Sequence, residues 1–185
     1  MKKNPSLTFK KFKNQAGFGL LEVIGALVIG AVAVAAVSPT ISSMLDDAKV
    51  EKDVDMANFA KTKIMSFTSN SPNTSGVSTA WAISNRAVPA DKIDGAVINN
   101  NLGGTFVFAP ATITNANDAI SITSNHYNQQ QCNAVAKKLA SGFLTVVVNA
   151  ATIKNTTDNA ANEGALAAAC TNQNNNTIIF SFLKG

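Results

Sequence analysis

Hydrophobic and polar residues divide this chain of 185 residues into three parts. The first seventeen residues are polar and basic, and from residue 23 to residue 37 every residue is Ala, Val, Ile, Leu or Gly. Farther on, apolar residues recur at the three- and four-residue spacing of an amphipathic helix. The pattern predicts a leader at residues 1–17, a long helix at 18–67 with an apolar first half at 18–41, and one globular domain at 68–185.

The apolar segment is long enough to cross a membrane. Its twenty residues from Phe18 to Val37 span about 30 Å as a helix, close to the thickness of a bilayer's hydrocarbon core. The one charged residue in it is Glu22, and an acid in such a segment usually marks a function. Pro39 lacks a backbone donor, so we expect it to bend the helix.

Beyond Pro39 the helix becomes amphipathic, and we expect its apolar stripe to lie across a sheet. The charged residues of the same stretch, Asp53 among them, are expected on the solvated face. The stripe consists of Ile41, Met44, Leu45, Ala48, Met56, Phe59, Ala60, Ile64 and Phe67.

The region after residue 67 alternates short strand-like and helix-like segments. We predict strands at 105–108, 120–123, 143–149 and 177–182, and helices at 130–141 and 160–169. Gly142 should end the first of these helices, and the strand at 143–149 looks buried on both sides. Residues 68–79 and 86–94 read as irregular. The predicted fold class is α+β, with the long helix packed on an antiparallel sheet.

The junction between leader and apolar segment carries a specific motif. Gly17 follows a small residue, Phe18 comes next, Glu22 lies four residues later, and Pro39 follows the apolar run. These residues resemble the N-terminus of type IV pilins. The resemblance implies cleavage by a prepilin peptidase between Gly17 and Phe18, N-methylation of Phe18, a role for Glu22 in assembly and a helix bend at Pro39. Gly19 departs from the family pattern, in which Thr or Ser is usual.

Two rival interpretations of this N-terminus fit less well. A secretory signal peptide is cut after its apolar region, where this chain offers only Ala36 as a weak site. An uncleaved anchor would not need an acid such as Glu22 close to the end of its span.

The basic balance belongs to the precursor rather than to the mature chain. Five of the fifteen basic residues lie in the leader, which leaves ten against eleven acidic residues. The net charge of +4 is therefore no sign of nucleic-acid binding. The leader's lysines instead fit the rule that positive charge stays on the cytoplasmic side of a membrane.

Cys132 and Cys170 are the two cysteines. Disulfides persist in exported domains, so we expect the pair to be joined. A bridge over 38 positions contributes about 4 kcal/mol in the chain-entropy model. The pilin resemblance implies that it bounds a C-terminal surface region.

The sequence carries no other pattern typical of chemistry. His126 is the only histidine, and no Cys or carboxylate stands at ligand spacing, so we expect a loop residue rather than a metal ligand. Nucleophile elbows, phosphate loops and paired-carboxylate motifs are missing. We therefore predict no enzymatic activity, no cofactor and no metal.

We interpret the chain as the precursor of a pilus subunit, the major one, of the type IVb subclass. The leader length and the Cys-bounded region favour that subclass, whereas Phe18 suits type IVa. The subunit would polymerise through its apolar helix into an extracellular filament used in adhesion, aggregation or DNA transfer. Expected partners are further copies in a homopolymer, the prepilin peptidase, the inner membrane before assembly, the pilus assembly machinery, and surface receptors of host or bacterial cells.

Two alternative functions stay open at this point. One is a type II secretion pseudopilin, although many of these bind calcium through late acids, and here only Asp158 and Glu163 lie late in the chain. The other is a minor or tip pilin that acts as an adhesin or an initiator.

Overall fold

A computed structural model describes the backbone from Leu20 to Gly185 and the side chains from Met44 onward. The chain forms two compact units, residues 1–42 and residues 43–185, and the fold described below is that of the second. Helix α1 (Leu20–Thr68) is one continuous helix of 49 residues, close to the predicted 18–67.

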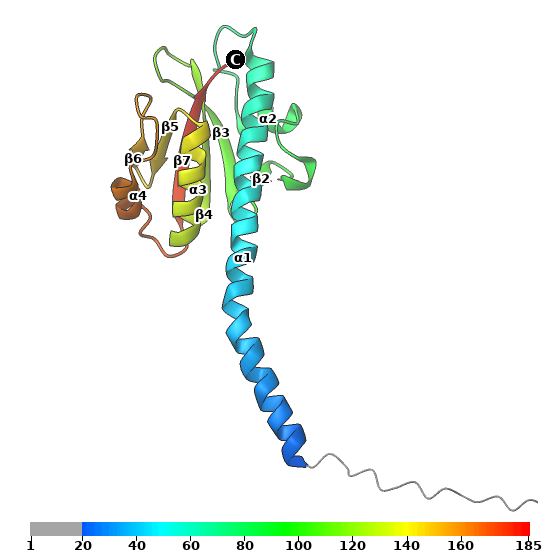
Figure 1. The fold of residues 1–185 in the computed structure, drawn as a ribbon. Coiled ribbons are helices and arrows are strands. Elements are labelled where there is room, and N and C mark those ends of the chain that lie inside the picture. The colour runs from blue at the N-terminus through cyan, green and yellow to red at the C-terminus, as the bar shows by residue number, and fades with distance from the viewer. Residues whose placement is uncertain (1–19) are drawn as a thin grey trace, which may run out of the picture. The chain divides into compact units, whose positions relative to one another are not determined.

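Seven strands form one sheet after this helix, in the order β1-β2-β3-β4-β7-β5-β6, and every neighbouring pair is antiparallel (Figure 1). The predicted α+β fold is therefore confirmed. The strands are β1 (Ile93–Asp94), β2 (Val97–Asn99), β3 (Thr105–Ala111), β4 (Ala119–Tyr127), β5 (Thr145–Val148), β6 (Ala151–Lys154) and β7 (Asn176–Leu183). The shorter helices are α2 (Thr79–Ser84), the 3-10 turn η1 (Ala90–Lys92), α3 (Gln129–Gly142) and α4 (Glu163–Ala169).

The core lies between this sheet and the two helices α1 and α3. Alternating residues of β3, β4 and β7 point to the helices, and those of β7 are Ile178, Phe180 and Phe182. Ala57 and Ala60 of α1 have no exposed surface, and such small side chains allow a helix to approach a sheet closely. Helix α3 lies beside α1 and adds its own buried face, Cys132, Val135, Ala136, Leu139 and Ala140.

The face of α1 that packs on the sheet differs in part from the predicted stripe. Met56, Ala60 and Ile64 are buried as expected, but they are joined by Val50, Val54 and Ala57. The helix carries two apolar stripes, and packing selects the one whose small and β-branched side chains fit the sheet. The other stripe stays exposed: Met44 by 66%, Leu45 by 58%, Phe59 by 42% and Phe67 by 49%.

Two expectations about the strands are also corrected. The strand predicted at 143–149 is not buried on both sides, because Val146 and Val148 face the core while Thr145 and Val147 are half-exposed on the opposite face. The pattern missed β6, whose four residues are too few and too polar to show alternation. Helix α3 does end at Gly142, as predicted.

Candidate functional site

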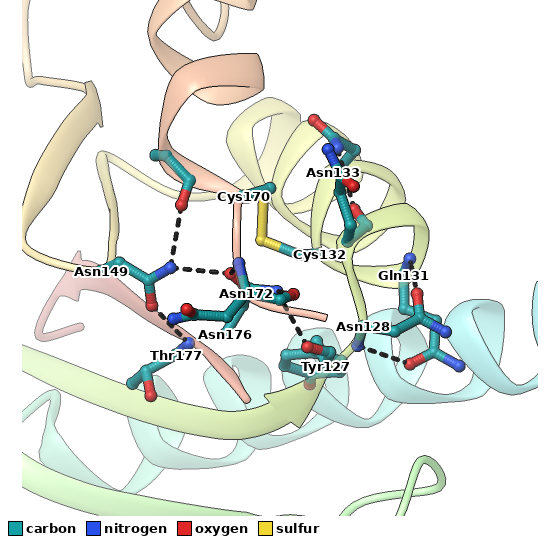
Figure 2. Close-up of a disulfide and its surroundings, with 12 residues drawn as sticks. Tyr127, Asn128, Gln131, Cys132, Asn133, Asn149, Cys170, Asn172, Asn176 and Thr177 are labelled. Atoms are coloured by element: carbon teal, nitrogen blue, oxygen red, sulfur yellow. Dashed lines mark hydrogen bonds between the residues drawn. A yellow bond between two sulfur atoms is a disulfide. The ribbon is translucent and has the colours of Figure 1, made fainter. Parts of the chain in front are cut away.

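The disulfide lies in the globular unit of residues 43–185, which we call the head. Cys132 lies in the first turn of α3 and Cys170 caps the end of α4. Their sulfur atoms are bonded, the Cα atoms are 5.8 Å apart, and neither residue is exposed (Figure 2). The bridge thus ties α3 to α4 and encloses β5 and β6.

Local sequence explains why α3 begins where it does. The Asn128 side chain accepts the Gln131 N–H at 2.8 Å, and the Gln131 side chain accepts the Asn128 N–H at 3.0 Å. This reciprocal capping box satisfies two backbone donors that a helix start leaves unpaired. It fixes the first turn of α3 and so directs Cys132 into the core.

A buried amide, Asn176, organises the segment that follows the bridge. Its Nδ2 donates to the carbonyl oxygens of Tyr127 and Asn172, at 2.9 and 2.6 Å. Its Oδ1 accepts from the Asn149 side chain at 2.7 Å and from the Asn172 N–H at 3.1 Å. All four hydrogen-bonding positions of this amide are used, so the Asn-rich stretch before β7 is held in place rather than merely solvated.

Two lysines donate hydrogen bonds to the carbonyl oxygens at the C-terminal end of α3. Lys154 of β6 is 8% exposed, and its Nζ donates to the carbonyl oxygens of Ala140 and Phe143 at 2.6 and 2.8 Å. Lys61 of α1 donates to the carbonyl oxygen of Gly142 at 2.5 Å. The C-terminal end of a helix carries unpaired carbonyls and partial negative charge, and these two ammonium groups offset both.

Asp53 of α1 is buried, which corrects its expected place on the solvated face. It is 1% exposed because it lies on the same face as Val50, Val54 and Ala57. Its carboxylate accepts the N–H and the Nδ2 of Asn101, each at 2.7 Å, and the Tyr127 hydroxyl at 3.2 Å. Burial raises the pKa of Asp53, and these hydrogen bonds lower it in part.

His126 is not the loop residue that the sequence predicted. It is exposed in strand β4, next to a bulge, with a φ of 70°. The neighbouring turn approaches closely, because a Cβ on Gly104 would lie 2.7 Å from the His126 Cβ. Among the residues that the structure describes, no group of three or more His, Cys, Asp and Glu side chains could hold a metal ion.

The exposed stripe of α1 borders a groove of about 460 Å³. One wall is α1, and the other is the segment from Pro89 to the β2–β3 turn. Charges of both signs surround an apolar floor. The lining residues are Lys52, Asp55, Met56, Phe59, Pro89, Asp91, Lys92 and Asn101.

The residues predicted at the N-terminus are described little or not at all. Gly17 and Phe18 lie outside the described residues, and of Glu22 and Pro39 only the place in α1 is described. Helix α1 is continuous through Pro39. Among the residues that the structure describes, no helix is long and apolar enough to cross a membrane.

Comparison with known proteins identifies the family. The family described as "PilS N terminal" matches residues 47–183, about three quarters of the chain. The chain belongs to the PilS N-terminal family. A second family description, "Prokaryotic N-terminal methylation motif", matches residues 12–38 of this PilS-family chain.

Two solved structures share the fold of this PilS-family chain. The type IVb pilin from Salmonella typhi is 20% identical, with 72% of this chain and 98% of that one covered and a TM-score of 0.55. TcpA, a type IV pilin from Vibrio cholerae El Tor biotype, is 19% identical, with 75% and 99% covered and a TM-score of 0.52. No curated protein matches this chain.

Family and fold together confirm the resemblance to type IV pilins. They identify the PilS-family chain as a pilus subunit, a structural protein rather than an enzyme, as predicted. Membership also implies a membrane-anchored precursor, processing machinery and an extracellular pilus.

Proposed function

We propose that this chain is the major subunit of a type IVb pilus. It enters the inner membrane as a precursor, is cut by prepilin peptidase between Gly17 and Phe18, and is methylated at Phe18. Residues 18–41 then polymerise into the core of an extracellular filament used in adhesion, aggregation or DNA transfer. One observation carries the proposal: a methylation motif at 12–38 and a PilS head at 47–183 stand in the same chain.

Charge supports a specific role for Glu22 in this filament. Cleavage would create a positive amine at Phe18, one helical turn before Glu22, and no Lys or Arg lies between Phe18 and Asp47. An unpaired charge in apolar surroundings costs several kcal/mol, on the order of a buried ion's desolvation. Glu22 therefore pairs with an α-amine, its own or that of the next subunit. A pair between subunits fixes the axial register, which the non-directional apolar contacts do not.

The exposed start of the head also supports polymerisation through α1. Met44 and Leu45 lie three and four residues beyond the apolar half of the helix and are exposed by 66% and 58%. Adjacent large apolar side chains at such exposure are typical of contact surfaces. Neighbouring subunits in a filament would cover them.

The test replaces Glu22 in a strain that lacks the wild-type subunit. We expect Glu22→Ala to abolish or strongly reduce filaments in electron micrographs, and Glu22→Asp to give an intermediate yield because it keeps the charge and loses reach. Glu51→Ala is the matched control, since Glu51 is an exposed acid of the same helix that pairs with Lys138. It should assemble normally.

Intact mass spectrometry of the same strains tests the processing step. Every variant should start at a methylated Phe18, because the substitution acts after cleavage. A chain that keeps Met1, or one that starts after Ala36, would refute the processing. Normal filament yield from Glu22→Ala would refute the role in register. A subunit that forms only a trace of sheared filaments would be minor rather than major.

A further inference from the structure

The face of the sheet that points away from the core carries a row of β-branched side chains, which we call the ridge. In the register of the sheet it crosses four neighbouring strands, β3, β4, β7 and β5, and consists of Val107, Thr123, Ile179 and Val147. Both neighbours of each residue along its strand are buried in the core, so the four side chains lie on the opposite face. Val107 is 48% exposed, and the other three are half-buried.

A second row beside the ridge consists of smaller side chains, and we call it the trough. It lies two residues away along each strand, about 7 Å from the ridge. Its members are Ala109, Ser121, Ser181 and Thr145. Ridge and trough contain no charged and no aromatic side chain. The outer face of the sheet is therefore uncharged and gently corrugated.

This chemistry excludes several kinds of partner. Nucleic acid and anionic lipids are bound through cationic side chains, which ridge and trough lack. A charged protein surface would lose hydration on this face without gaining an opposite charge. Another flat and uncharged protein face fits better, because β-branched side chains lose little rotamer freedom when they are covered.

A second copy of this chain presents such a face. When two copies are related by a two-fold axis, the ridge of one can enter the trough of the other, as in sheets stacked about 10 Å apart. Subunits along a helical filament meet through two different surfaces, whereas a face that contacts itself closes into a pair. The contact of this face with itself therefore joins subunits of two different filaments.

The area of the face indicates how such a contact would act. Four strands about 4.8 Å apart, each with about six residues at about 3.4 Å, cover roughly 400 Å². Two copies would bury roughly 800 Å², which is less than the about 1,200 Å² of the smallest stable interfaces. Two free subunits would not stay together through this face. A filament repeats the contact along its length, and linked contacts bind far more tightly than a single one.

We propose that the outer face of the sheet joins filaments side by side into bundles, through ridge and trough contacts between two copies of the chain. This inference rests on the proposed function, because it requires filaments. It names the partner of the head as the same face of a subunit in a neighbouring filament.

Electron microscopy of cells that express Thr123→Lys in place of the wild type tests the inference. Thr123 lies in the middle of the ridge, so the new charge would be buried wherever two filaments touch. We expect a normal yield of sheared filaments and a loss of bundles. Thr156→Lys is the matched control, because Thr156 is exposed in the connection between β6 and α4, and it should bundle like the wild type. Bundles that persist in Thr123→Lys, or that disappear in Thr156→Lys, would overturn the inference.

A charge exchange tests whether the face contacts itself. Filaments of Thr123→Glu should also lie singly, because like charges would then meet between filaments. When sheared filaments of Thr123→Lys and Thr123→Glu are mixed, we expect bundles that contain both, which gold labels of two sizes would show. Two dispersed variants that stay dispersed when mixed would overturn the inference, since the charges would then act at different surfaces.

The filament yield separates this inference from the proposed function. Wild-type filaments that lie singly would overturn only the bundling, whereas a wild type without filaments would overturn the proposed function and the bundling with it. Should the Thr123 variants fail to fold, the response of wild-type bundles to salt replaces them. An uncharged contact is not screened, so bundles should persist from about 0.05 M to about 0.5 M NaCl. Bundles that disperse as the salt rises would overturn the inference.

Discussion

Removing the disulfide should cost the head a large part of its stability. The perturbation is Cys132→Ala together with Cys170→Ala, which deletes the bridge and leaves neither a free thiol nor a buried hydroxyl. The bridge spans 38 positions, and the chain-entropy model gives about 4 kcal/mol for a loop of that length. Domains of this size unfold with about 5–15 kcal/mol, so the loss would be a substantial fraction of the total.

The contacts around the bridge decide how this loss is distributed. Without the covalent link, Lys154 still donates to the end of α3, and Asn176 still joins β7 to the carbonyl of Tyr127. Strand β5 also keeps its pairing with β7. We therefore expect the whole head to unfold at lower denaturant in one transition, rather than the bounded region to detach by itself.

Urea unfolding of the full-length protein in micelles, followed by the fluorescence of Trp81, measures the effect. The reference is the oxidised wild type, and the control is the wild type with reductant, which should unfold like the variant. The variant itself should not respond to reductant. A loss below about 1 kcal/mol, far under the expected entropy term, would refute the reasoning, as would a wild type that is insensitive to reductant.

Two further predictions concern turns of the head. Gly104→Ala should destabilise it by about 1–3 kcal/mol, the usual cost of overpacking, because the new methyl group meets Asn125 and His126, whereas Gly76→Ala, with nothing within 4 Å, should be neutral in the same urea assay. Asp118 accepts the N–H groups of Ile113, Thr114 and Asn115, and these hydrogen bonds lower its pKa. The stability that Asp118 contributes is therefore present above the pKa of the unfolded state, and it is lost as the pH falls through the pKa of the folded state. Amide protection of 113–115 should therefore fall in acid, and this dependence should vanish in Asp118→Asn. Protection that rises in acid would contradict the prediction.

Much of the fold could be predicted because strong alternation and helical spacing are local signals. The strands around Phe106, Ile122 and Phe180 and the helix that ends at Gly142 follow directly from such patterns. The packing face of α1 could not be predicted in full. Its two apolar stripes have similar spacing, and only the shape of the sheet decides between them.

Some residues of the candidate site could be predicted from local signals in the sequence, and others could not. The cysteine pair could be predicted from composition and export alone. Asp53 and Asn176 could not, because their partners lie far away in the chain: 48 positions separate Asp53 from Asn101, and 49 separate Asn176 from Tyr127. A polar residue reveals its burial in the sequence only when it interrupts a clear apolar stripe. The predicted stripe of α1 followed other residues, so Asp53 did not appear in the sequence as an interruption of an apolar face.

The order of the strands also determines when the head can fold. Strand β7 follows every other strand in the chain, yet it lies between β4 and β5 in the middle of the sheet. Until β7 has left the membrane, β4 and β5 each have an unpaired edge. The strands β1–β4 and the strands β5–β6 then form two separate sheets. Exposed edges of this kind invite pairing with other chains. The head thus depends on its last strand to pair the free edges of β4 and β5 and so to protect them from other chains.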